Sequence, residues 1–272
     1  MTSPQPIRVR PHTWLVLAVG SLAGLAMFLW PLLTSPSAGT PHHAEAPFIF
    51  VLILPLVIAV VLAEMSAGDI DVKAIAMLGL LAGVGAALRP LGTGTAGIET
   101  VFFLLILAGR VYGPGFGFVL GSITLFASAL LTGGVGPWLP FQMLAASWIG
   151  MGAGLLPRCT GRVEIAVLAV YGAVSAYVFG FLLNMWFWPY SLGTFIGDGA
   201  KPALQFVPGD SVVGNLHRFF VFTFATSTLG WDTGRAITNV VAILTLGSAV
   251  LAALRRARRR VAFHPEVAFE PA

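Results

Sequence analysis

The chain has 272 residues, of which 57% are hydrophobic and only 10% are charged. A soluble domain carries about 25% charged residues, so this composition excludes a soluble enzyme and indicates an integral membrane protein. The formal net charge is +4, yet we expect no nucleic-acid partner. The basic run Arg255 to Arg260 directly follows an expected membrane span, where it would contact anionic lipid headgroups.

Eight stretches are apolar over most of the roughly 20 residues that a helix needs to cross a bilayer. They are residues 13–34, 47–65, 73–89, 99–112, 115–132, 138–157, 163–187 and 233–254. The first is longer than the ~7–15 apolar residues of a signal peptide, which makes it a membrane helix, with cleavage near residues 35–40 as the alternative. Gly113 and Pro114 predict a tight turn after the short fourth stretch.

Basic residues lie in alternate links, which predicts that both chain ends and these links are cytoplasmic. On that side fall Arg8, Arg10, Lys73, Arg110, Arg158, Arg162 and the arginines of 255–260; Arg89, Lys201, Arg218 and Arg235 fall outside. We therefore expect an all-α multi-pass protein with about eight spans, and six or seven if the first two pair differently. Its parts are a two-helix extension (1–72), a six-helix core (73–254) and a basic cytoplasmic tail (255–272).

The longer links all fall on the outer side under this topology, and they are rich in glycine and tryptophan. They comprise residues 89–100, 132–140 and 184–231. Plain connectors would be short on both sides, so this asymmetry predicts a site that opens outward. Polar side chains at membrane depth are costly and usually face a cavity or a partner. We therefore expect a ligand site formed by Trp138, Gln142, Asn184, Trp231, Asp232, Arg235 and Asn239.

Several of these residues also have plainer interpretations. Tryptophans near span ends, including Trp186 and Trp188, serve as interfacial anchors in many membrane proteins. Asp232 and Arg235 have the spacing of an intrahelical ion pair, and Asp232 could instead cap the N-terminus of the last span.

Metal and catalytic chemistry find little support in the sequence. His42 and His43 have no further histidines at metal-ligand spacing, and Cys159 is the single cysteine, so we expect neither a metal site nor a disulfide. A serine–histidine–aspartate arrangement, a zinc-protease motif and a phosphate-binding P-loop are all missing. We expect no enzyme activity and no cofactor, and any ATP-driven transport would need a partner that hydrolyses ATP.

Small residues recur every four positions on the third stretch, at Gly79, Gly83 and Ala87. Such a stripe lets two helices approach closely inside a bilayer. It either packs within the chain or docks onto another membrane subunit. Gly20 and Gly24 on the first stretch are a weaker example.

From Lys73 onward the sequence resembles the substrate-binding S-components of energy-coupling factor (ECF) vitamin transporters. The resemblance rests on GVGAALRPL (83–91), ETVFFLLILAGRVYGPGFGFVLGSITLFAS (99–128), TGGVGPWLPFQMLAASWIGMGAGLLP (132–157) and LGWDTGRAITN (229–239). The expected pair of helices before the core departs from the six-helix plan of that family.

The resemblance implies a subunit of the prokaryotic plasma membrane that binds a vitamin-like molecule on its outer face. It implies partnership with a membrane coupling subunit and cytoplasmic ATPases, with Gly79, Gly83 and Ala87 as the docking surface for the coupling subunit. Cobalamin is our choice of ligand, and a thiamine- or riboflavin-like ring is the alternative. Two rival functions stay open, namely a membrane assembly protein and a solitary transporter or channel without ATPases.

Overall fold

The described part of the chain is helical throughout. The computed structural model describes residues 11–33, 56–57, 59–60, 63, 72–92, 97–190, 204–207 and 210–262. Every regular element within these ranges is a helix, as expected for the fold class. The second expected span (47–65) lies largely outside the described residues, and His42, His43 and the alternative cleavage stretch 35–40 lie entirely outside them.

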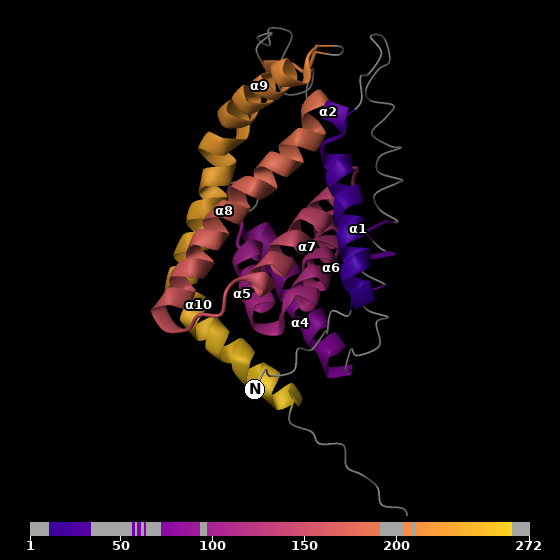
Figure 1. Cartoon of the computed structure of the whole chain (residues 1–272). Helices are drawn as coiled ribbons and strands as arrows, with labels where there is room; N and C mark the ends of the chain where they lie inside the picture. Colours follow the sequence, from indigo (N-terminus) through magenta and orange to yellow (C-terminus); the bar gives the residue numbers. More distant parts are fainter. Residues whose placement is uncertain are drawn as a thin grey trace, which may run out of the picture.

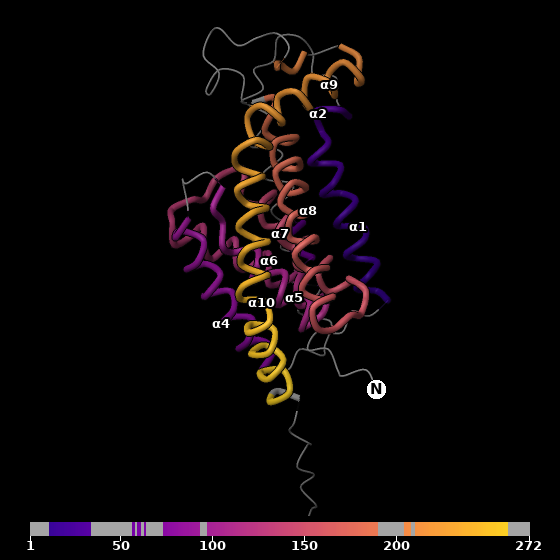
Figure 2. Tube along the Cα trace, turned by 90° about the vertical axis from the view of Figure 1, so that its left-hand side faces the viewer, coloured from indigo at the N-terminus to yellow at the C-terminus, as the bar shows by residue number. Residues whose placement is uncertain are grey.

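The helices form a bundle whose centre is made by three consecutive elements. The elements are α1 (Pro11–Phe28), α2 (Trp30–Leu33), α4 (Val72–Leu88), η2 (Arg89–Gly92), α5 (Val101–Tyr112), α6 (Pro114–Thr132), α7 (Leu139–Leu155), α8 (Gly161–Phe187), η3 (Trp188–Tyr190), α9 (Val212–Thr223), η5 (Phe224–Asp232) and α10 (Thr233–Ala262). Helices α5, α6 and α7 pack together, with α4 against α6 and the long α8 and α10 side by side (Figures 1 and 2). Helix α1 covers the opposite flank, on α7 and α8.

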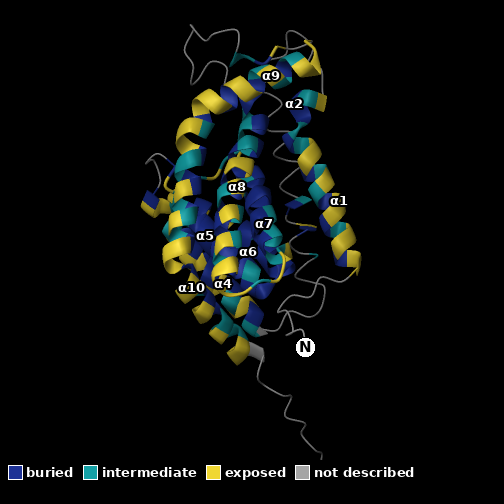
Figure 3. Ribbon diagram, turned by 60° about the vertical axis from the view of Figure 1, so that its left-hand side comes forward, coloured by how far each residue is buried: buried dark blue, intermediate teal, exposed yellow. Residues whose placement is uncertain are grey.

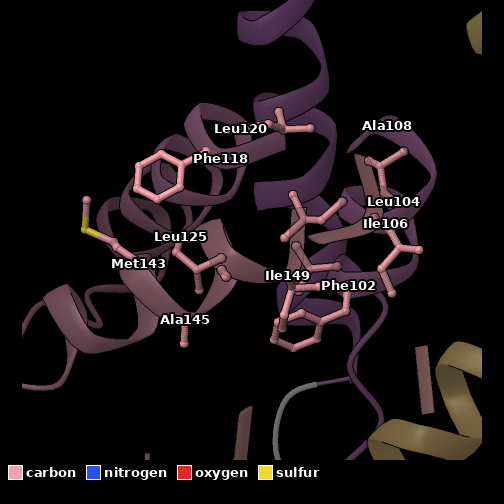
Figure 4. Close-up of a cluster of buried hydrophobic side chains, with 14 of the residues drawn as sticks. Phe102, Leu104, Ile106, Ala108, Phe118, Leu120, Leu125, Met143, Ala145 and Ile149 are labelled. Atoms are coloured by element: carbon pink, nitrogen blue, oxygen red, sulfur yellow. The ribbon is translucent and has the colours of Figure 1, made fainter. Parts of the chain in front are cut away.

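Glycines set the close packing of this centre. A side chain on Gly109 or on Gly117 would overlap the backbone of Gly150, so α5 and α6 both touch α7 through bare backbone. The tight turn predicted between the fourth and fifth stretches is confirmed: Gly113 adopts a φ of 98°, and Pro114 begins α6. Around these contacts lies an apolar core, part of which is drawn in Figure 4, with side chains such as Phe102, Leu125 and Ile149 buried between the helices.

Five described helical stretches are long and apolar enough to cross a membrane. They are Pro11–Phe28, Lys73–Gly92, Pro114–Thr132, Gly161–Phe187 and Val212–Arg260. Helix α5 has 12 residues and α7 has 17, so both are shorter than a typical span. The chain is thus a multi-pass membrane protein, whereas the total of eight spans and the position of its ends stay predictions.

The outward faces of the peripheral helices are apolar, as a lipid-facing surface requires. Exposed residues mark one side of α1, α8 and α10 in Figure 3, and they include large hydrophobic side chains such as Leu22, Val170 and Leu244. Contiguous apolar surface on this scale would make a soluble protein aggregate. In a bilayer it meets acyl chains instead.

The prediction of a loop at 184–231 is wrong for its second half, which is helical. Ser211 caps a new helix by accepting a 3.0 Å hydrogen bond from the Gly214 amide. This helix, α9, continues through the π-helical η5 into α10, so the last helical stretch starts 21 residues earlier than the predicted Thr233. Phe219 and Phe222 stabilise it by packing against Trp188 in a second apolar cluster, separate from the main core. The threonine, serine and glycine residues among its aromatic residues made this stretch resemble a loop in the sequence.

Opposite charges meet at the other end of α10. The carboxylate of Glu164, at the start of α8, accepts hydrogen bonds from Arg110 Nε at 2.8 Å and from Arg255 Nη2 at 2.7 Å. Arg110 also donates to the main-chain oxygen of Leu156 and contacts Cys159 in the link between α7 and α8. This basic end is the one that the charge distribution of the sequence assigns to the cytoplasm.

The two small-residue stripes have different surroundings. On α1, a side chain at Gly24 would overlap Leu144 and one at Gly20 would overlap Val60, so that stripe packs inside the molecule. On α4, a methyl group added at Gly79 or Gly83 would meet no atom of the described residues within 4 Å. Together with the exposed Ala87, these two glycines form an open strip on the surface of α4.

Candidate functional site

A cavity of about 670 Å³ opens where the ends of several helices converge. Its volume is within the ~300–1,000 Å³ typical of pockets for small molecules. It combines an aromatic wall with two arginines, two carboxylates and two amides. Its lining residues are Arg89, Glu99, Phe102, Leu125, Trp138, Gln142, Phe179, Gly180, Leu183, Asn184, Trp186, Phe187, Phe222, Thr226, Ser227, Trp231, Asp232 and Arg235.

The structure brings six of the seven predicted ligand residues to this cavity. Those six are Trp138, Gln142, Asn184, Trp231, Asp232 and Arg235. The seventh, Asn239, is not among the lining residues: it is fully buried one turn farther along α10, where its amide donates to the Gly172 carbonyl of α8 at 3.0 Å. Its position therefore indicates a contact between two helices.

Arg235 is the centre of an ion network on the cavity wall. Its Nε and Nη2 donate to the two carboxylate oxygens of Glu99 at 3.0 and 3.3 Å, and its Nη1 donates to Asp232 Oδ1 at 2.9 Å. The guanidinium lies over the ring of Phe179, 4.9 Å from its centre. The link just before α5, which carries Glu99, is thereby tied to η5 and α10 at the cavity.

The carboxylate of Asp232 is held on every side. Its second oxygen accepts from Ser227 Oγ at 2.8 Å. It lies directly against Gly180 of α8, where any side chain would overlap it. The predicted i,i+3 ion pair with Arg235 is therefore confirmed. The alternative role of Asp232 as a helix N-cap is wrong, because the helix runs through this residue without a break.

Arg89 and Gln142 form a second polar pair on the cavity lining. Arg89 Nη2 donates to Gln142 Oε1 at 2.9 Å, which joins the end of α4 to α7. Gln142 lies shortly after the break between α6 and α7 and lines the cavity. The break itself is a left-handed turn at Gly133 that ends α6.

Two tryptophans border the cavity near its opening. Trp138 and Trp231 are 42% and 44% exposed, whereas Trp186 and Trp188 are buried. The interpretation of the latter two as lipid-interface anchors is therefore wrong. Trp231 is positioned by Gly97, whose φ of 80° and lack of a side chain let it lie against the Trp231 main-chain carbonyl.

Several lining residues gave no signal in the sequence. Phe102, Phe179 and Gly180 stand inside apolar runs, and Thr226 and Ser227 stand in the stretch interpreted as a loop. A hollow of about 900 Å³ between α8, α9 and η5 is larger, but it is lined mainly by apolar side chains such as Phe220 and Phe224 and resembles the lipid-facing surface around it. The cavity at Arg235 is the candidate site because charged, amide and aromatic groups converge there.

Comparison with known proteins decides the family. The model of the ECF transporter substrate-specific component matches residues 73–213, slightly more than half of the chain. The chain belongs to this family. No curated protein and no solved structure matches the chain significantly. Family membership confirms the resemblance found in the sequence and makes this protein a multi-pass, substrate-binding subunit of a transporter rather than an enzyme.

Proposed function

We propose that this S-component binds a vitamin or a related micronutrient in the cavity at Arg235 and serves an ECF-type ABC importer of a prokaryotic plasma membrane. The observation that carries the proposal is the convergence of six independently predicted residues on one cavity of about 670 Å³. They come from three parts of the chain that are far apart in the sequence, namely the start of α7 with the residue before it, the end of α8, and the continuous stretch of η5 and α10. Trp138, Gln142, Asn184 and Trp231 contact the ligand, while Asp232 and Arg235 form the wall that holds it.

The size of the cavity bears on which vitamin is bound. A pocket of this volume encloses a drug-sized molecule. Cobalamin, a corrin macrocycle with a nucleotide loop, is several times larger and would have to project far out of the opening. The cavity therefore favours the smaller thiamine- or riboflavin-like rings over cobalamin.

The importer also needs partners that supply energy. The open strip of Gly79, Gly83 and Ala87 on α4 is the proposed docking surface for a membrane coupling subunit, which in turn binds two cytoplasmic ATPases. Its openness supports this role, because small residues that pack inside the chain, such as Gly24, are already in contact. The rival functions, an assembly protein or a solitary channel, give no reason for a closed polar network inside an aromatic cavity.

Native mass spectrometry of the detergent-purified protein tests the binding role. We expect an added mass that matches a vitamin-sized molecule, present as purified or after incubation with a vitamin panel. The adduct should weaken strongly in Trp231→Ala and persist in Trp14→Ala, because Trp14 is similarly exposed, at 38%, but lies on the outer face of α1. A protein that stays empty under all these conditions would favour the assembly protein instead.

A further inference from the structure

The charges that line the cavity neutralise one another within the protein. Among the described residues, two arginines and two carboxylates line it, and their formal charges cancel. Each oxygen of Glu99 accepts from Arg235, and the two oxygens of Asp232 accept from Arg235 and Ser227. All four carboxylate oxygens therefore already have a donor, and a cationic ligand would find no unpaired carboxylate.

The arginines are engaged in the same way. Arg235 donates to Glu99, to Asp232 and to the main-chain oxygen of Ala176. Arg89 donates to Gln142, whose amide oxygen must face the arginine because a guanidinium has donors only. At Arg235 an anionic ligand would have to displace Glu99 or Asp232, and a displaced Asp232 would stay buried without its partner, which is strongly unfavourable. At Arg89 the ligand would have to compete with the amide oxygen of Gln142.

The groups left over are neutral donors. Asn184 lines the cavity, and its side-chain amide nitrogen is buried and has no hydrogen-bond partner among the described residues. Native proteins leave few buried donors unpaired, so such a group at a cavity indicates a ligand acceptor. The amide nitrogen of Gln142 is a second donor, because its oxygen is already taken by Arg89.

We infer that the ligand of this site is an uncharged, ring-bearing molecule whose carbonyl or ring-nitrogen acceptors pair with the side-chain amide of Asn184. The aromatic side chains Phe179, Trp186 and Trp231 offer ring faces for stacking. The network of Glu99, Asp232 and Arg235 shapes the wall and supplies no charge to the ligand. This inference rests on the proposed function and specifies the substrate class of the same cavity.

Two measurements on the full-length protein in detergent test the inference. The first releases any bound molecule by denaturation and identifies it, with its charge, by mass spectrometry. The second titrates four probes against tryptophan fluorescence at neutral pH: riboflavin, which is uncharged, thiamine, a cation, biotin, a monoanion, and folate, a dianion. We expect an uncharged molecule to be released or riboflavin to bind at least 100-fold more tightly than the three charged probes.

Variants test the role of Asn184. Asn184→Leu should raise the dissociation constant of the uncharged ligand at least tenfold, and Asn184→Asp should do the same because it replaces the donor with an acceptor. The matched control is Asn215→Ala, since the Asn215 amide already donates to Val207 outside the cavity. That variant should keep the affinity of the parent protein even where its thermal stability falls.

The outcomes separate this inference from the proposed function. Release of a charged molecule, or tighter binding of a charged probe, would overturn the inference and leave the proposed function standing. Unchanged affinity in both Asn184 variants would overturn the assigned amide contact. A preparation that releases nothing and binds none of the four probes would overturn the proposed function, and the inference with it.

Discussion

Trp30 donates its indole N–H to the main-chain oxygen of Trp186 across 3.4 Å. The donor belongs to α2, in the expected N-terminal extension, and the acceptor lines the cavity at the end of α8. The rings of Phe28 and Trp186 also both pack against the ring of Phe141, with centres 5.0 and 4.4 Å from it. The extension therefore supports a wall of the cavity from behind.

Phe28→Ala should destabilise the protein and weaken ligand binding. Phe28 is fully buried, and replacing a buried phenylalanine with alanine costs about 3–5 kcal/mol of unfolding free energy. Thermal unfolding and ligand titration in detergent would measure both effects. Leu22→Ala on the exposed face of the same helix is the control and should change neither. Lower stability with unaltered affinity would show that the extension stabilises the fold but does not shape the ligand site.

Gly97→Ala should impair binding more than the matched change Gly133→Ala. Both glycines have positive φ, 80° and 64°, which an alanine adopts at a cost of about 1–2 kcal/mol. Only at Gly97 would the new methyl group also overlap the Trp231 carbonyl; at Gly133 it meets open space. We expect lower stability in both variants and a raised dissociation constant in Gly97→Ala alone. Equal affinities would show that Trp231 does not depend on this contact.

Gly83→Val on the open strip of α4 should leave folding and ligand binding intact but reduce association with the coupling subunit at least tenfold. A Cβ at this position meets no atom of the described residues within 4 Å, so a valine there would chiefly block the close approach of another helix. Co-purification with the coupling subunit and ATPases is the measurement. Gly85→Val is the contrast on the same helix, because its side chain would overlap Thr124 and should lower thermal stability. Normal assembly of Gly83→Val would refute the docking surface.

Glu164→Gln should destabilise the basic end by about 3–5 kcal/mol, because it leaves Arg110 and Arg255 without their shared carboxylate. Glu164 is only 2% exposed, so water cannot replace the lost charge. The exposed pair Asp210 and Arg218 provides the control. The hydrogen bond from Arg218 lowers the pKa of Asp210, so this pair is formed at neutral pH and is lost only as the pH falls through that lowered pKa.

Asp210→Asn at neutral pH should therefore change thermal unfolding little, since solvent screens an exposed ion pair. Both variants are compared by the midpoint of thermal unfolding in detergent at neutral pH. A drop in Glu164→Gln no larger than that of Asp210→Asn would show that the buried pair does not hold α5, α8 and α10 together.

The sequence predicted the parts of the site that stand out from an apolar background. Gln142 and Asn184 are polar residues inside expected spans, and Asp232 lies directly before one, so the cost of burying polar groups at membrane depth selected all three. The same rule selected Asn239, because it cannot distinguish a cavity from a contact between two helices.

Other features depended on packing that periodicity does not reveal. Phe179 and Gly180 look like any residues of a buried helix, and only the return of η5 against α8 brings Asp232 to them. Likewise, helix α9 forms because Phe219 and Phe222 meet Trp188, a contact between segments about 30 residues apart. Contacts between residues this far apart in the sequence depend on the tertiary fold and leave no mark in the local periodicity.

One continuous helix, α10, carries Arg235 at the cavity and Arg255 at the basic end. They are roughly 20 residues apart, which is about 30 Å of helix axis and equals the thickness of the hydrocarbon layer. Helix α10 is therefore long enough to place Arg235 near one surface of a bilayer and Arg255 near the other. Because both arginines lie on one continuous helix, any tilt of α10 that moves Arg235 away from one surface of the bilayer also moves Arg255 away from the other.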